Sequence, residues 1–154
     1  MGDYKREIRD TFTYHGAGFA VVLRRLPMLL LGTEWVFDIK PSAIDRRIFE
    51  RLPHQASRLT GYQVRFIRIY ADMTLKAFAH RFGVSHPAVL KWERAGDSMT
   101  NMSWSTEKDI RLFVLSQSES SAQEFQAFYE ALTTEANEAV TPLEIDIEEL
   151  VGVH

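Results

Sequence analysis

The segment from Leu59 to Gly96 constrains the fold most, because its caps and apolar spacing predict three short helices joined by two tight turns. Thr60 followed three residues later by Gln63 is a capping-box pattern. Apolar side chains then recur at helical spacing at Val64, Ile67 and Tyr70. The sequence therefore predicts a first helix from about Thr60 to Tyr70.

The second and third helices of this segment follow the same logic. Thr74 caps the second helix, which ends at Gly83 because glycine can adopt positive φ. Ser85 caps the third helix, where Pro87 is tolerated because the first helical turn has no acceptor for its missing N–H. We expect this third helix to continue to about Arg94.

Several groups of residues in this segment match a known pattern: Thr74–Ala79, Gly83–Ser85, Val89 and Trp92–Arg94. They resemble the Cro/C1-type (XRE) helix-turn-helix, in which a small residue, a glycine turn and a W-E-R-G-like ending recur at these spacings. Arg68 and Glu93 also match the paired arginine and glutamate of that family. The resemblance implies a partly buried, charge-assisted hydrogen bond that ties the first helix to the end of the third.

The resemblance also implies that the helix from Ser85 to Arg94 enters the major groove of DNA. Histidine and lysine can donate to guanine and alanine can contact a thymine methyl, so His86, Ala88 and Lys91 would face base edges. The expected DNA-binding residues, including those near phosphates, are Thr74, Lys76, Arg81, Ser85, His86, Ala88, Lys91 and Arg94. The chain departs from the family at Leu75, where glutamine is usual, and at Pro87, where a polar residue is usual.

The net charge of −3 hides a strong asymmetry along the chain. Residues 46–94 hold ten Lys or Arg against three acids, whereas residues 112–154 hold nine acids and no Lys or Arg. A polyanion such as DNA is therefore drawn to the middle of the chain and repelled by its end. For the charge alone, the alternative is a solvated helical face that is basic without binding a ligand.

The first part of the chain predicts a different kind of structure. Segments rich in β-branched and aromatic residues, separated by turn signals, lie at Thr11–Phe19, Ala20–Arg25, Met28–Leu31 and Glu34–Ile39. We expect them to form a small antiparallel sheet. Ser42–Leu52 then predicts a helix that Pro53 ends, with Pro53–Leu59 as a linker.

This order of a β lobe, a linking helix and a helix-turn-helix resembles the two-domain antitoxins of the MqsA type. Phe12-Thr13-Tyr14 and Leu26-Pro27 match segments that precede a zinc-binding cysteine box in those proteins. Here Met28–Leu31 occupies the corresponding stretch and cannot ligate zinc, so apolar packing would replace the metal. The resemblance implies a toxin protein as a partner, and an unrelated β-hairpin lobe is the alternative.

Beyond the helix-turn-helix segment, the sequence predicts two more helices and a strand. Ser105–Glu107 begins an amphipathic helix that would close the DNA-binding core, and Ser121 with Glu124 is another capping box. Leu143–Ile147 alternates apolar and acidic residues, as an edge strand does. This acidic strand would pair with another chain or shield the basic face, or else remain a solvated terminal segment packed weakly on its own domain.

The predicted fold class is α+β: a small antiparallel β lobe with a linking helix in residues 1–52, a helix-turn-helix domain in 53–117, and a C-terminal helix with an acidic tail in 118–154. The chain has no cysteine, and its five histidines show no ligand spacing. No catalytic cluster can be placed either, so we expect no enzyme, cofactor or metal. The longest apolar run, Leu26–Leu31, is far too short to span a membrane, and no signal peptide is recognisable, which predicts a cytoplasmic protein.

Together these features predict a DNA-binding transcriptional regulator, a repressor that autoregulates its operon if it is an antitoxin. The operator logic of the family implies a homodimer on two half-sites of double-stranded DNA. The alternative is a protein-interaction module, such as a toxin-binding antitoxin or a partner subunit, whose helix-turn-helix no longer reads DNA. Leu75 and Pro87 favour this alternative, whereas the basic segment favours DNA.

Overall fold

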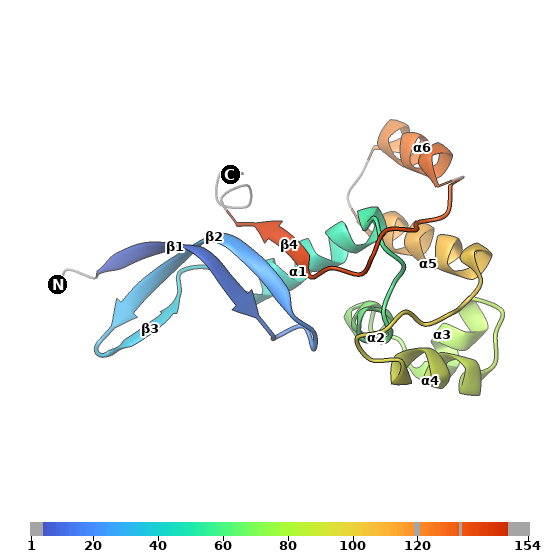
Figure 1. Ribbon diagram of the computed structural model, residues 1–154, viewed down its shortest axis with the longest axis horizontal. Helices are drawn as coiled ribbons and strands as arrows, with labels where there is room; N and C mark the ends of the chain where they lie inside the picture. Colours follow the sequence, from blue (N-terminus) through green and yellow to red (C-terminus); the bar gives the residue numbers. More distant parts are fainter. Residues whose placement is uncertain (1–4, 119–120, 133, 148–154) are drawn as a thin grey trace. The chain divides into compact units, whose positions relative to one another are not determined.

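A computed structural model describes residues 5–118, 121–132 and 134–147 of the chain. In these residues a four-stranded sheet is combined with six α-helices (Figure 1), which confirms the expected mixture of α and β structure. The chain divides into two compact units. Among the described residues, unit 1 comprises 5–48 and 142–147, and unit 2 comprises those from 49 to 141.

The sheet of unit 1 is built around one long central strand, β2 (Val21–Leu31). β1 (Arg6–Tyr14) pairs antiparallel with one edge of β2 along residues 21–29. β3 (Glu34–Phe37) pairs antiparallel with the end of β2, and β4 (Leu143–Asp146) pairs parallel with its beginning. Because β1 occupies one edge of β2 along most of its length, β3 and β4 share the other edge.

The expected break at Leu26-Pro27 is wrong, because β2 continues through it and Pro27 pairs in register with Ile8. β1 likewise begins at Arg6 rather than at Thr11. The irregularity of β2 lies at Arg25, whose φ of 55° is in the left-handed region and shifts the strand by one side-chain position. The buried side chains of β2 are accordingly Val21, Leu23, Leu26 and Met28.

The C-terminal strand β4 completes the sheet of the N-terminal unit. Its inward side chains and that of the following residue are buried: Leu143, Ile145 and Ile147. Its acidic side chains pair with arginines of β2, Glu144 with Arg24 at 3.0 Å and Asp146 with Arg25. The segment Leu143–Ile147 is therefore packed into the sheet and not a weakly packed terminal segment, although Glu144 itself remains exposed. Other acids of the tail lie outside the described residues: Glu119, Glu148 and Glu149.

α1 (Pro41–Arg51) follows the sheet and continues as a 3₁₀ turn, Leu52–His54, so the helical path does not end at Pro53 as expected. Within unit 1, the Tyr14 hydroxyl donates a hydrogen bond of 3.0 Å to the Asp45 carboxylate of α1. Burial, together with the hydrogen bond and charge of Asp45, raises the pKa of Tyr14 to about 12. The core of unit 1 also includes Phe19, Ile44 and Ile48.

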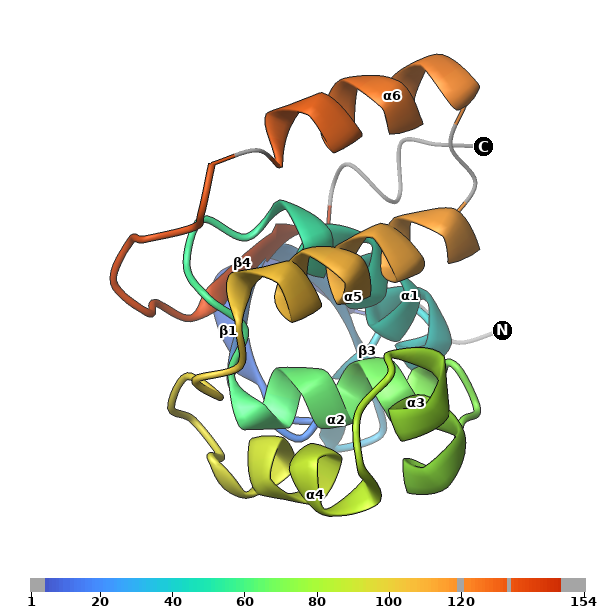
Figure 2. The same cartoon turned by 90° about the vertical axis from the view of Figure 1, so that its right-hand side faces the viewer.

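Unit 2 is helical (Figure 2). Its helices are α2 (Gly61–Tyr70), α3 (Leu75–Arg81), α4 (His86–Arg94), α5 (Trp104–Gln117) and α6 (Ala122–Ala131). α4 packs against both α2 and α3, and α5 lies beside α6. None of the described helices combines the length and the apolar character that a membrane crossing requires.

Most of the predicted helix caps are confirmed: Thr60, Thr74, Ser85 and Ser121 each accept a hydrogen bond from the backbone three residues later. α5 begins at Trp104, one residue before the expected Ser105, and Ser103 caps it. The core that these helices enclose includes Leu59, Val64, Ile67, Phe78, Val89, Ile110 and Val114.

Candidate nucleic-acid interface

α4 lies at the margin of unit 2, with one side against α2 and α3 (Figure 2). Val89 is fully buried on that side, and Trp92 is 8% exposed. On the outward side, the exposed residues are His86, Pro87, Lys91 and Arg94. Because these positions follow the helical period, α4 separates an apolar face from a polar one that is open to solvent in the described unit.

The turn between α3 and α4 is built around Gly83, whose φ of 68° confirms the expected positive value. A Cβ at this position would meet no atom within 4 Å, so backbone conformation rather than space favours glycine. The Val84 amide donates to the Ala79 carbonyl at 3.0 Å and satisfies the end of α3. The turn thereby orients α4 relative to α3.

A pair of side chains ties α2 to the end of α4, as expected. The Arg68 guanidinium donates two hydrogen bonds to the Glu93 carboxylate, from Nε at 2.8 Å and from Nη2 at 2.9 Å. Its Nη1 donates a third, of 3.0 Å, to the Met73 carbonyl. The Glu93 side chain is 8% exposed and that of Arg68 is 14% exposed, so the pair is largely shielded from water.

The burial of Glu93 also determines the charge of the outer surface. Residues 74–94, which comprise α3, α4 and their N-terminal caps, contain no other Asp or Glu. The exposed charged side chains of this segment are therefore all cationic: Lys76, Arg81, Lys91 and Arg94. Arg81 alone of these forms an ion pair within the described residues, with Asp109 at 3.6 Å.

The structure places nearly every expected DNA-binding residue at an exposed position of α3, α4 or their caps: Thr74, Lys76, Arg81, Ser85, His86, Lys91 and Arg94. Ala88 is half-buried. Among the two departures from the family pattern, Leu75 is half-buried and Pro87 is exposed on the outer side of α4. Thr74 and Ser85 use their hydroxyl oxygens as acceptors for helix capping, which leaves each O–H free to donate.

A buried network of charges, which was not predicted from the sequence, joins α5 to the segment that leads into α2. Glu107 of α5 is 0% exposed, and its carboxylate binds Arg111 through Oε2 and Arg58 through Oε1, both bonds of Arg111 being 2.9–3.1 Å. The Leu59 amide, just before α2, also donates to Glu107 at 3.0 Å. The guanidinium groups of both arginines lie over the Trp104 ring.

Arg111 fixes the path of the chain that leads into α2. Its guanidinium donates to backbone carbonyls of Pro53, Gln55 and Ser57. Burial lowers the pKa of Arg111, while Glu107 opposes this shift and Arg58 adds to it. The one signal in the sequence is the i, i+4 spacing of Glu107 and Arg111, which commonly marks an exposed ion pair and does not indicate burial.

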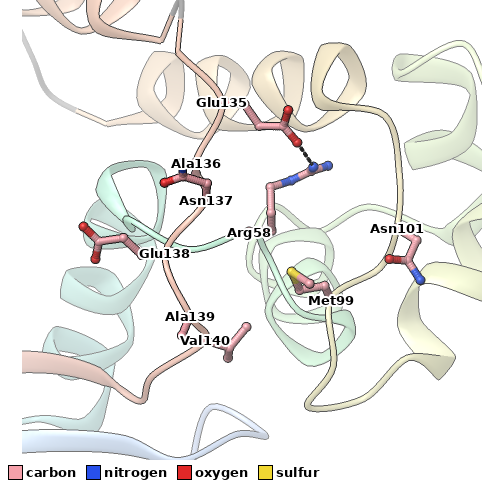
Figure 3. A pocket seen from close by; sticks show the side chains of 9 residues that line it. All are labelled: Arg58, Met99, Asn101, Glu135, Ala136, Asn137, Glu138, Ala139 and Val140. Carbon is pink, nitrogen blue, oxygen red and sulfur yellow. Dashed lines mark hydrogen bonds and ion pairs between the residues drawn. The ribbon is translucent and has the colours of Figure 1, made fainter.

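Unit 2 also contains a pocket of about 350 Å³ to which α4 contributes no residue (Figure 3). It is lined by Arg58, Met99, Asn101, Glu135, Ala136, Asn137, Glu138, Ala139 and Val140. Arg58 and Glu135 point toward each other across it and form an ion pair of 2.6 Å. Among the described residues, no group of three or more potential ligands is arranged to hold a metal ion.

Comparison with known proteins adds no further assignment: no family model, curated protein or solved structure matches this chain.

Proposed function

We propose that this protein is a sequence-specific DNA-binding transcriptional regulator, a repressor, that reads the major groove with α4. The observation that carries the proposal is the outer surface of α3 and α4. It presents exposed cations without an exposed carboxylate, because Glu93, the one acid of the segment, is turned inward against Arg68. Such a surface attracts a polyanion and contains no acidic group to repel it.

The positions of the side chains suit the two kinds of contact that a DNA reader makes. His86 and Lys91 lie on the outward side of α4, where they can donate hydrogen bonds to base edges in a major groove. Lys76 is exposed on α3 and Arg94 is exposed at the end of α4, and both would contact phosphates, as would the cap of α3 at Thr74. The bidentate Arg68–Glu93 pair holds α4 in one orientation, which base recognition requires.

The resemblance to the Cro/C1-type helix-turn-helix supports the same proposal. Regulators of that kind act as homodimers on half-sites about 34 Å apart, one helical turn of DNA. We extend this arrangement to the present protein, in which the capped helices and the positive φ of Gly83 have the geometry that such a motif needs.

The proposal is tested by selecting binding sites from a pool of random DNA duplexes with the purified full chain. We expect a recurrent, two-fold symmetric sequence, with an affinity that falls steeply as the salt concentration rises. Recovery of unrelated sequences after repeated selection would contradict sequence-specific reading, and the absence of any salt-dependent binding would contradict DNA binding altogether.

A second candidate function is a protein-interaction module, and the exposure of Pro87 favours it. Proline supplies no N–H and no polar side-chain group at a position that would face the groove. In this case the partner would be a toxin protein encoded by an adjacent gene, as the antitoxin-like order of segments implies. Co-purification of the full chain with the adjacent gene product distinguishes the two, and both functions coexist in an autorepressing antitoxin.

A further inference from the structure

The outer edge of β1 is unpaired within the described chain. β1 pairs with β2 alone, because β3 and β4 both pair with β2. The Lys5 carbonyl accepts a hydrogen bond of 2.8 Å from the Leu30 amide, so Lys5 directs its peptide groups toward β2. Because this direction alternates along a strand, Arg6, Ile8 and Asp10 direct theirs toward the open edge.

The side chains along this edge alternate in charge around one apolar residue. Residues 6–10 read Arg-Glu-Ile-Arg-Asp, and all but Arg9, which is half-buried, are exposed. Ile8 is 68% exposed and pairs with Pro27, whose neighbours Leu26 and Met28 are buried, so Ile8 lies on the face of the sheet opposite to these buried side chains. Ile8 is therefore an isolated apolar side chain on the exposed face, between charged neighbours at the open edge of the sheet.

We propose that β1 pairs antiparallel with β1 of a second copy of this chain, with Ile8 opposite Ile8 of that copy. In this register Arg6 of each copy faces Asp10 of the other, and Glu7 faces Arg9. Each pairing occurs twice, because the dimer is two-fold symmetric. Every charged residue of the segment thus meets an opposite charge, the arrangement that stabilises directly opposed residues of neighbouring strands.

Neighbouring registers lack this complementarity. A two-fold axis normal to the sheet leaves each side chain on the same face in both copies, and directly opposed residues must share a face. Each allowed register is therefore centred on one residue, which lies opposite itself. Centring on Glu7 would place Glu7 opposite itself and Arg9 opposite Lys5. Centring on Arg9 would place two Arg9 side chains together. Like charges directly opposite each other are destabilising, so the register centred on Ile8 is favoured.

A charged edge usually protects a sheet from pairing with other strands. Here the order of the charges gives the edge a specific partner, because the segment is complementary to its own antiparallel copy. The pairing joins two sheets through backbone hydrogen bonds and buries both Ile8 side chains. This inference goes beyond the proposed DNA binding and does not depend on it, since it involves no residue of α3 or α4.

Sedimentation velocity of the full chain over a range of concentrations tests the proposal. We expect a monomer–dimer equilibrium. Glu7→Arg gives each copy two cations at positions 7 and 9, and Arg9→Glu gives two anions, so either change should weaken dimerisation at least about tenfold. An equimolar mixture of the two variants should regain the dimer, because the cations of one chain then face the anions of the other.

The mixture provides its own control for folding. Both variants lose the Arg9–Glu7 ion pair of 2.9 Å within the chain, so recovery on mixing cannot come from that contact. Glu34→Arg is a matched charge reversal at an exposed position of β3 and should leave dimerisation unchanged. A wild-type chain that stays monomeric throughout, or a mixture that fails to associate, would overturn the proposal and leave the edge to a strand of another protein.

A cross-linking experiment gives an independent readout of the register. The chain has no cysteine, so Ile8→Cys introduces a single thiol at the proposed two-fold axis. A short thiol-reactive cross-linker should then produce a covalent dimer, whereas Leu31→Cys, at the exposed end of β2, should not. Equal cross-linking at both positions would contradict the register.

Substitutions in α4 that abolish DNA binding should alter neither dimerisation nor cross-linking. Failure of the DNA-binding proposal and failure of the dimer proposal can therefore be told apart.

Discussion

Gly61, the first residue of α2, packs directly against the main-chain carbonyl of Trp92 in α4. A Cβ at Gly61 would lie 2.4 Å from the Trp92 oxygen and 2.6 Å from the Gly96 nitrogen. The neighbouring Tyr62 amide donates a hydrogen bond of 2.9 Å to the Gly96 carbonyl. The start of α2 therefore rests on the backbone at the end of α4, and glycine is needed there for space rather than for an unusual φ.

We predict that Gly61→Ala destabilises the protein by about 1–3 kcal/mol, because the added methyl group overpacks a contact with backbone atoms that cannot rotate away. The free energy of unfolding, measured by urea denaturation of the full chain, checks this value. An unchanged or increased stability would show that the two helix ends do not lie in close contact.

We predict that Glu93→Gln costs about 2 kcal/mol of stability, since it leaves the shielded Arg68 guanidinium without its charge partner. Arg65→Gln is a suitable control, because the Arg65 side chain is 59% exposed and its Nε lies 4.0 Å from Glu93. That control should change the free energy of unfolding by less than about 0.5 kcal/mol. Equal effects of the two variants would contradict a special role for the Arg68–Glu93 pair.

We predict that Tyr14 makes the stability of the protein depend on pH above about pH 10. Its pKa rises from 10.0 to about 12 in the folded protein, so the fold favours the protonated phenol. This contribution to stability is fully present below pH 10 and is lost as the pH rises from about 10 to about 12. Wild type should therefore lose stability over this range relative to Tyr14→Phe. In Asp45→Asn, tyrosinate absorbance should show the pKa of Tyr14 moving back toward its ordinary value.

We predict that single substitutions in α3 and α4 separate the reading of bases from contacts with phosphates. Lys91→Ala should relax the base preference at one position of the selected site. Lys76→Ala and Arg94→Ala should instead weaken binding to all duplexes and reduce the slope of log affinity against log salt by about 1 each. Lys40→Ala, an exposed cation of unit 1, serves as the control and should change neither property. If all these variants bound like wild type, α4 would not be the reading helix.

Local features of this chain were predictable because the groups that interact in them lie within a few residues of each other along the sequence. The caps at Thr60, Thr74 and Ser85 each join groups three residues apart, and the turn at Gly83 needs one backbone conformation. Apolar spacing then indicated which side of α4 is buried. The Arg68–Glu93 pair could be predicted for a different reason, because the prediction rested on a resemblance to a family and not on spacing.

Other features depend on partners that no local pattern specifies. The alternation of Leu143–Ile147 predicted a strand, but its pairing with β2 depends on residues more than a hundred positions earlier. Pro27 lies inside β2 because β1 pairs with it on one edge. On the other edge it falls between the stretches of β2 that pair with β4 and with β3, where a missing N–H interrupts no ladder. Helical spacing alone places a residue on one face of its own element and does not show what will cover that face.

The candidate interface combines features that local sequence predicts with features that only long-range packing decides. The residue types and spacing of 74–94 already contained the cations, the caps and the glycine turn, because each depends on its immediate neighbours along the chain. The outer surface lacks an exposed acid because folding turns Glu93 inward against Arg68. The buried Glu107–Arg111 pair fixes the path of the chain that leads into α2. Long-range packing decides the burial of Glu93 and of the Glu107–Arg111 pair, because burial depends on which distant segments exclude water from a side chain.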